Sequence, residues 1–186
     1  QIPDQYQYLD YGLDLYAPQT TLDEEGRRVM IAWVRMPKVT EDGWIGMFCT
    51  PRVVEVKNGH ICFKMHPNIK SAYSRDISGT EEAPEDGYMA VFDLEEGAGA
   101  DIGGFRISRV NGRVKVDRTA VYPSFEGAHL VSETPVIAGT AHLEVLVDQH
   151  LIEIYINDGE YVISNAVYGA GKQITTEGVD MVRLYG

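Results

Sequence analysis

Apolar and polar residues alternate with a period of two along most of this chain, the pattern of strands with one buried and one exposed face. Over no helical length do apolar residues recur at intervals of three, four and seven, so the sequence predicts an all-β fold. The predicted strands are 29–34, 61–65, 87–94, 105–110, 113–121, 142–147, 151–156, 160–167 and 180–185.

Tight-turn dipeptides separate several of these strands. Asn58-Gly59, Asn111-Gly112 and Asp158-Gly159 each supply the positive-φ positions that a two-residue hairpin turn needs. From about residue 53 onward the strands follow at short, regular spacing, which predicts a sandwich of two antiparallel sheets. Two runs in this region, the acidic 78–87 and the glycine-rich 97–104, are expected to be loops.

The strand predicted at 151–156 shows the alternation clearly. Ile152 and Ile154 point to one face, while Glu153 and Tyr155 point to the other. The first face is therefore expected to form core, and the second to meet solvent or a neighbouring domain.

The opening hairpin, "DLYAPQTTLDEEGRRVMIAW", places an acid and a phenol, Asp14 and Tyr16, on one face of its first strand. Pro18 has no N–H and is expected to end the ladder, and Gly26 is expected in the left-handed region of the turn. From the residues alone, a surface strand end in which Asp14 caps a turn is favoured over a binding face.

Composition and charge exclude some partners. Hydrophobic residues make up 44% and charged residues 24% of the 186 residues, as in an ordinary globular protein, and the net charge is −12. Nucleic acid and anionic membrane surfaces are therefore not expected as partners, since both need clustered Lys and Arg. No apolar run approaches the roughly 18 residues of a membrane span, and no signal peptide is recognisable. Cys49 and Cys62 are interpreted as buried thiols.

No set of residues in the sequence forms a recognisable catalytic or metal-binding motif. The five histidines have no metal-ligand spacing, and no nucleophile-plus-base motif or phosphate loop occurs, so neither metal nor cofactor is expected. Trp33 and Trp44 are the two tryptophans, and each indole is either a core residue or a flat surface for the C–H face of a sugar ring.

Three segments of the chain form a recognisable set: "YLDYGLDLYAPQTTLDEEGRRVMIAWVRMP", "GWIGMFCTPRVVEVKNGHICFKMHPNI" and "HLEVLVDQHLIEIYINDGEYVISNAVYG". Together they resemble segments of glycoside hydrolase family 32, which includes β-fructofuranosidases, sucrose-6-phosphate hydrolases, levanases and inulinases. The first and last segments are specific, whereas residues 70–140 carry little of the resemblance. Two departures are small: Leu15 stands where Phe is commoner, and Ala32 where Gly precedes the Trp.

The resemblance implies a five-bladed β-propeller that holds the active site, followed by a concanavalin-like β-sandwich. Residues 1–52 would be the last propeller strands and residues 53–186 the sandwich. The first strands are then expected to fold back on the sandwich, to pair with a second copy or to be disordered. The resemblance implies that the family's catalytic motifs, an Asp in "NDPN", an Asp in "RDP" and a Glu in "EC", all lie upstream of the "DLYAPQ" segment and are absent here. Arg75-Asp76-Ile77 lacks the Pro of "RDP" and follows that segment, and Cys49 follows Phe48 rather than a Glu, so neither is taken as a catalytic motif.

The resemblance thus implies the C-terminal part of a retaining β-fructosidase, inactive without its N-terminal propeller portion. The intact enzyme would hydrolyse terminal β-D-fructofuranosides such as sucrose, sucrose-6-phosphate or fructans, with Asp14, Tyr16 and Trp33 near the sugar. The alternative is a non-catalytic carbohydrate-binding, structural or oligomerisation module, with Tyr16, Trp33 and Tyr155 as the platform. The bacterial cytoplasm is the favoured location, secretion is compatible, and a homo-oligomer is compatible with either function.

Overall fold

A computed structural model describes residues 7–79, 82–85 and 87–186 and contains three antiparallel sheets in layers. Within these residues the helical structure is confined to α1 (Pro67–Ala72) and the 3-10 helix η1 (Thr119–Val121), so the all-β prediction is confirmed. No helix in the described part of the chain is long and apolar enough to cross a membrane.

The first sheet contains the N-terminal strands in the order β1-β2-β4-β5, with the short β3 paired to the end of β2. The strand β4 crosses back to β2, where Val29 lies opposite Val53 and Met30 opposite Arg52. The strands of the first sheet are β1 (Leu15–Leu22), β2 (Arg28–Val34), β3 (Met47–Phe48), β4 (Arg52–Lys57) and β5 (His60–Met65).

The central sheet has the order β13-β12-β11-β6-β15, and the third sheet has the order β10-β9-β8-β7-β14. The central strands are β6 (Tyr88–Leu94), β11 (Ala141–Asp148), β12 (Leu151–Ile156), β13 (Tyr161–Ala166) and β15 (Arg183–Tyr185). The strands of the third sheet are β7 (Gly99–Ile102), β8 (Phe105–Val110), β9 (Arg113–Asp117), β10 (Val131–Glu133) and β14 (Ile174–Glu177).

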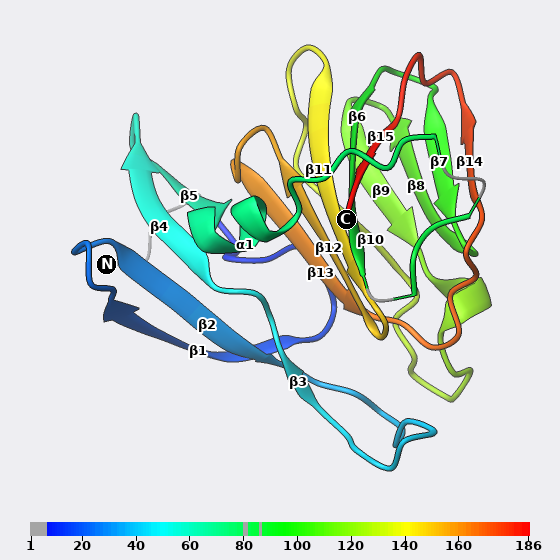
Figure 1. Cartoon of the computed structure of the whole chain (residues 1–186), viewed down its shortest axis with the longest axis horizontal. Coiled ribbons are helices and arrows are strands. Elements are labelled where there is room, and N and C mark those ends of the chain that lie inside the picture. Colours follow the sequence, from blue (N-terminus) through cyan, green and yellow to red (C-terminus); the bar gives the residue numbers. More distant parts are fainter. Residues whose placement is uncertain (1–6, 80–81, 86) are drawn as a thin grey trace.

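Two hydrophobic cores lie on the two faces of the central sheet. One core joins it to the third sheet, with Ile152 and Ile154 against residues such as Phe105. The other joins it to the first sheet, with Tyr155 and Val162 in the same cluster as Met30 and Ala32. Figure 1 shows the central strands between the two outer groups of strands. The first strands therefore fold back on the rest of the molecule, one of the outcomes expected from the sequence.

Two of the three predicted two-residue hairpin turns are confirmed, and the third, at Asp158-Gly159, is a longer turn of residues 157–160. Asn58 and Gly59 have φ of 54° and 80° between β4 and β5, and Asn111 and Gly112 have φ of 53° and 72° between β8 and β9. In the turn between β12 and β13 Gly159 has a φ of 81°, and the turn lies so close to β5 that an added Cβ would be 2.4 Å from the Phe63 carbonyl oxygen.

Three sequence expectations were wrong. The glycine-rich run 97–104, expected to be a loop, contains β7, which pairs with both β8 and β14. Pro18 does not end the first ladder, because pairing resumes at Gln19 after a bulge in which Ala17 takes a φ of 50°. The strand predicted at 113–121 ends at Asp117 and gives way to η1.

Tyr155 was also predicted wrongly as an exposed platform residue. Its side chain is 1% exposed and Glu153 is 0% exposed, because the first sheet covers the face of β12 that both residues occupy. Residues 53–65, which the sequence placed with the second domain, belong to β4 and β5 and lie in the first sheet, where β4 pairs with β2. The described part of 78–87 lies outside helices and strands, and residues 80, 81 and 86 are outside the described residues.

Candidate functional site

Tyr16 and Trp33 form an open aromatic surface at one end of the first sheet. They lie directly opposite each other on β1 and β2, with ring centroids 6.1 Å apart and ring planes at 74°. Tyr16 is 55% exposed and Trp33 is 43% exposed, so both rings are accessible to a ligand. We call this pair the aromatic platform.

Local backbone geometry fixes the platform. The bulge at Ala17 and Pro18 directly follows Tyr16, so β1 changes its register with β2 at this point. On the other side, Gly46 has a φ of 80°, and an added Cβ would lie 2.5 Å from Nε1 of Trp33. The loop before β3 therefore rests on the edge of the indole, which only a glycine permits at this distance.

Arg35 extends the platform at the end of β2. Its guanidinium carbon lies 5.3 Å from the centre of the Tyr16 ring, within cation–π range, and the residue is exposed. Its backbone N–H donates to the Asp14 carbonyl at 3.0 Å, which holds the residue beside the start of β1.

The third predicted site residue, Asp14, has a different environment from Tyr16. Its carboxylate is 5% exposed and accepts hydrogen bonds from both terminal nitrogens of Arg118, with Nη2 3.1 Å from Oδ1. It also accepts from the backbone N–H of Ala166 at 2.8 Å. The structure thus brings Tyr16 and Trp33 together, and it turns the Asp14 carboxylate toward the joint between the sheets.

A second buried charge group, which sequence reasoning missed, lies between the first and central sheets. Arg52 is 0% exposed and donates to Asp10 and Glu153, each at 2.7 Å. The hydroxyl of Ser164 lies 2.9 Å from Asp10 and 3.1 Å from Glu153. Burial raises the pKa of Asp10 although the Arg52 guanidinium opposes this. The signal available in the sequence was a charged residue within an apolar strand, as in "LIEIYI".

A hollow of about 320 Å³ opens beside the platform, where the first sheet meets the loop after η1. Arg35, the paired Asp14 and Arg118, and two aromatic rings are among the residues that line it. The Arg118 guanidinium stacks on one of these rings, 3.5 Å from the centre of Tyr122. The lining residues of this seam hollow are Leu13, Asp14, Arg35, Met36, Pro37, Arg118, Tyr122, Phe125, Gly127 and His129.

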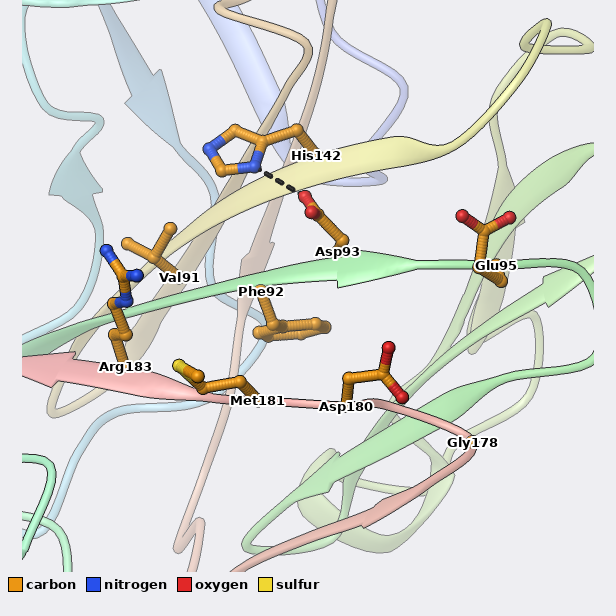
Figure 2. A pocket seen from close by; sticks show the side chains of 9 residues that line it. All are labelled: Val91, Phe92, Asp93, Glu95, His142, Gly178, Asp180, Met181 and Arg183. Atoms are coloured by element: carbon orange, nitrogen blue, oxygen red, sulfur yellow. Dashed lines mark hydrogen bonds and ion pairs between the residues drawn. The ribbon is translucent and has the colours of Figure 1, made fainter.

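Figure 2 shows a different hollow, of about 490 Å³, lined by strands β6, β11 and β15 and the chain before β15. Asp93 and His142 are joined by a 2.7 Å hydrogen bond at its edge, and Glu95 and Asp180 add two more carboxylates. Among the described residues no group of His, Cys, Asp or Glu side chains could hold a metal ion. Its aromatic residue, Phe92, is 3% exposed and belongs to the core, so the hollow offers no open ring to a sugar.

Two family models match the chain in succession. The model described as "Glycosyl hydrolases family 32 N-terminal domain" matches residues 1–67, and the model described as "Glycosyl hydrolases family 32 C terminal" matches residues 88–182. The second match alone spans more than half of the 186 residues.

Curated relatives and solved structures agree with these models. A sucrose-6-phosphate hydrolase of Vibrio alginolyticus is 25% identical over 95% of this chain, and a raffinose invertase of Escherichia coli is 27% identical over 88%. The chain spans only about two fifths of these relatives, 39% and 38% of their lengths.

Among solved structures, a sucrose-6-phosphate hydrolase from Lactobacillus gasseri superimposes with a TM-score of 0.79 at 20% identity, over 96% of this chain and 42% of that one. A family 32 β-fructofuranosidase from Bombyx mori superimposes with a TM-score of 0.72 at 21% identity, over 98% of this chain and 42% of that one. These likenesses concern the fold, and again only part of each longer protein.

Proposed function

Because this chain belongs to family 32 of the glycosyl hydrolases, we propose that it is the C-terminal part of a retaining β-fructosidase. The observation that supports this most directly is the order of the two family matches, residues 1–67 and then 88–182. The chain also spans only 39% of the length of the Vibrio alginolyticus relative. The intact enzyme would cleave terminal β-D-fructofuranosides such as sucrose, sucrose-6-phosphate or fructans.

The proposed architecture is an incomplete propeller followed by a β-sandwich. The first sheet would be the last part of the propeller, and the central and third sheets would be the sandwich. We place the boundary after Met65 rather than at residue 52, because β4 and β5 pair within the first sheet and the first family match ends at residue 67.

The outer face of the first sheet would contact the upstream part of the propeller. Ile31, Trp33 and Phe48 are 38%, 43% and 68% exposed on this sheet, an unusual amount of open apolar surface for one strand and its neighbour. An upstream segment that covers part of this face would leave the platform at the rim, where a substrate enters.

In this proposal Tyr16 and Trp33 form a wall against which the sugar packs. A sugar ring presents apolar C–H groups on one face, and exposed aromatic rings bury that face while leaving the hydroxyl groups free for hydrogen bonds. Asp14 contributes indirectly, because its carboxylate is engaged by Arg118 and anchors the start of β1 directly before Tyr16.

The chemical step would need residues outside this chain. Retaining glycosidases use two carboxyl groups about 5 Å apart, one as nucleophile and one as acid and base. The carboxylate nearest the platform in the seam hollow, Asp14, is bound by a guanidinium and a backbone N–H, so it is not free to attack a sugar carbon. The chain alone is therefore proposed to be inactive.

An activity assay tests the proposal. The 186-residue chain is assayed on sucrose and sucrose-6-phosphate, and a longer polypeptide that adds the upstream part of the propeller is assayed in parallel. We expect release of fructose only from the longer polypeptide, and a large loss of its kcat/KM on Trp33→Ala. Turnover by the chain alone would refute the assignment of the catalytic residues. Sugar binding without turnover in both forms would favour the alternative, a non-catalytic carbohydrate-binding module.

A further inference from the structure

Arg35 differs from most arginines of this acidic chain in its lack of an ionic partner. Arg27 and Arg118 pair with Asp23 and Asp14, whereas within the described residues no carboxylate pairs with the Arg35 guanidinium. Within the described residues its guanidinium lies over the Tyr16 ring and forms no side-chain hydrogen bond, so its N–H groups are available to a ligand. Among the described residues Arg28, Arg75 and Arg183 also form no ion pair, but Arg35 is the one that lies beside the aromatic platform and lines the seam hollow.

The seam hollow around Arg35 carries a positive charge. Asp14 is the one acid among its lining residues, and the Arg118 guanidinium neutralises that carboxylate at the buried end. Arg35 remains as the uncompensated charge among the residues that line the hollow. The volume of about 320 Å³ is large enough for a small polar group together with part of a sugar ring.

Arg35 links the seam hollow to the aromatic platform. Arg35 lines the hollow and at the same time lies 5.3 Å from the centre of the Tyr16 ring. A sugar packed on Tyr16 and Trp33 would therefore have the Arg35 guanidinium within reach of a substituent at its edge.

We infer that the seam hollow is a subsite for the phosphate group of a phosphorylated sugar, with Arg35 as its anion-binding residue. This rests on the proposed function and makes it narrower, because it selects phosphorylated fructosides over neutral ones as substrates. Arg suits this role since its planar fork of N–H donors matches two phosphate oxygens at once, which a neutral sugar hydroxyl does not. Phe125, which also lines the hollow and is 47% exposed, would cover the apolar side of the sugar.

Calorimetric titration of the 186-residue chain tests the subsite without any need for catalysis. The probes are glucose 6-phosphate, glucose and inorganic phosphate. We expect glucose 6-phosphate to bind at least about tenfold more tightly than glucose, the difference that one charge-assisted contact supplies. Inorganic phosphate is expected to compete with glucose 6-phosphate, and added salt to weaken the binding of both.

Substitutions locate the effect. Arg35→Gln should remove the preference for glucose 6-phosphate, and Arg35→Lys should keep part of it because the charge remains. Arg28→Gln is the matched control, since Arg28 lies at the other end of β2 and donates to Thr20 at 3.1 Å. An unchanged thermal midpoint verifies that each variant is folded.

Three results would overturn the subsite: no binding of glucose 6-phosphate, equal affinity for glucose, or a preference that survives in the Arg35→Gln chain. These outcomes are independent of the fructosidase assay. If the longer polypeptide shows no turnover but Arg35-dependent binding is found, the proposed function fails and the subsite stands. If the longer polypeptide shows turnover but the chain does not prefer glucose 6-phosphate to glucose, the subsite fails and the proposed function stands.

Discussion

The Arg118 guanidinium binds the Asp14 carboxylate across the joint between the third and first sheets, although the two residues are 104 positions apart in the chain. Nη2 donates to Oδ1 at 3.1 Å and Nη1 donates to Oδ2, while the backbone N–H of Ala166 adds a third bond to the carboxylate. Since both side chains are buried, this pair fixes where β1 begins and hence where Tyr16 lies.

Replacing Arg118 with Met is expected to destabilise the fold by about 3–5 kcal/mol, because it leaves the Asp14 carboxylate buried and unpaired. Urea unfolding of the two proteins measures the difference. Arg106→Met is the control: Arg106 is 70% exposed and lies 3.3 Å from Asp101, so its loss should change the unfolding free energy by less than about 1 kcal/mol. Equal effects of the two substitutions would contradict the role of Arg118.

The Arg52 group predicts a second large effect. Arg52→Met would leave the buried carboxylates of Asp10 and Glu153 without their cation, at an expected loss of about 3–5 kcal/mol. Adding Asp10→Asn and Glu153→Gln to that variant should restore part of the loss, because the buried charges are then removed together. Urea unfolding of the single and triple variants is the measurement, and a triple variant no more stable than the single one would contradict this account.

Gly46 is expected to control the orientation of Trp33. Gly46→Ala adds a Cβ about 2.5 Å from Nε1 of Trp33 and strains a backbone with a φ of 80°. The indole should move, and the near-ultraviolet circular dichroism of the tryptophans should change. Gly43→Ala is the matched control, since its φ of 84° imposes similar backbone strain with nothing near the added Cβ. A changed spectrum in the control and an unchanged one in Gly46→Ala would refute the contact.

Asp23 gives a dependence of stability on pH. Partial desolvation of the Asp23 carboxylate raises its pKa, but the hydrogen bonds from Arg27 outweigh this effect. The pKa of Asp23 is therefore lowered to about 2, from an ordinary 3.8. A lowered pKa stabilises the fold above pH 3.8 and this contribution disappears as the pH falls through about 2. The thermal midpoints of the native chain and Asp23→Asn should therefore differ at pH 6 and converge near pH 2, with Glu24→Gln as the control from the same turn. A difference that persists unchanged at pH 2 would be inconsistent with this linkage.

The two thiols are expected to be unreactive in the folded chain. Burial raises the pKa of Cys49 to about 11 and also raises that of Cys62, so little thiolate is present at pH 8. A thiol-specific chromogenic reagent should modify neither cysteine until urea unfolds the protein. Stoichiometric reaction in the absence of urea would show that one of them is accessible.

Local patterns predicted the elements that depend on neighbouring residues. The hairpin at Asn58-Gly59 was predictable because both residues tolerate the positive φ that the turn imposes. β7 was missed because Gly99 and its glycine-rich flanks have low strand propensity, and pairing with two neighbouring strands outweighs that propensity.

Long-range relationships were not predictable from the same patterns. Alternation placed Tyr155 and Ile154 on opposite faces correctly, but it does not reveal that a second sheet covers the outer face. The proximity of Tyr16 and Trp33 was predictable because they are cross-strand partners in one hairpin, and their role at a sugar site stays a prediction. The contact of Asp14 with Arg118 depends on how two distant segments pack, which no local sequence pattern encodes.

The central sheet is covered on both faces, which limits where the chain can be cut into stable fragments. A fragment that starts after Met65 would uncover the side of β12 on which Tyr155 and Glu153 are 1% and 0% exposed. Solvent would then reach an apolar surface that also carries the Glu153 carboxylate without its Arg52 partner. Such a fragment is expected to precipitate. Obtaining residues 66–186 as a soluble unit would require redesign of that side with hydrophilic side chains.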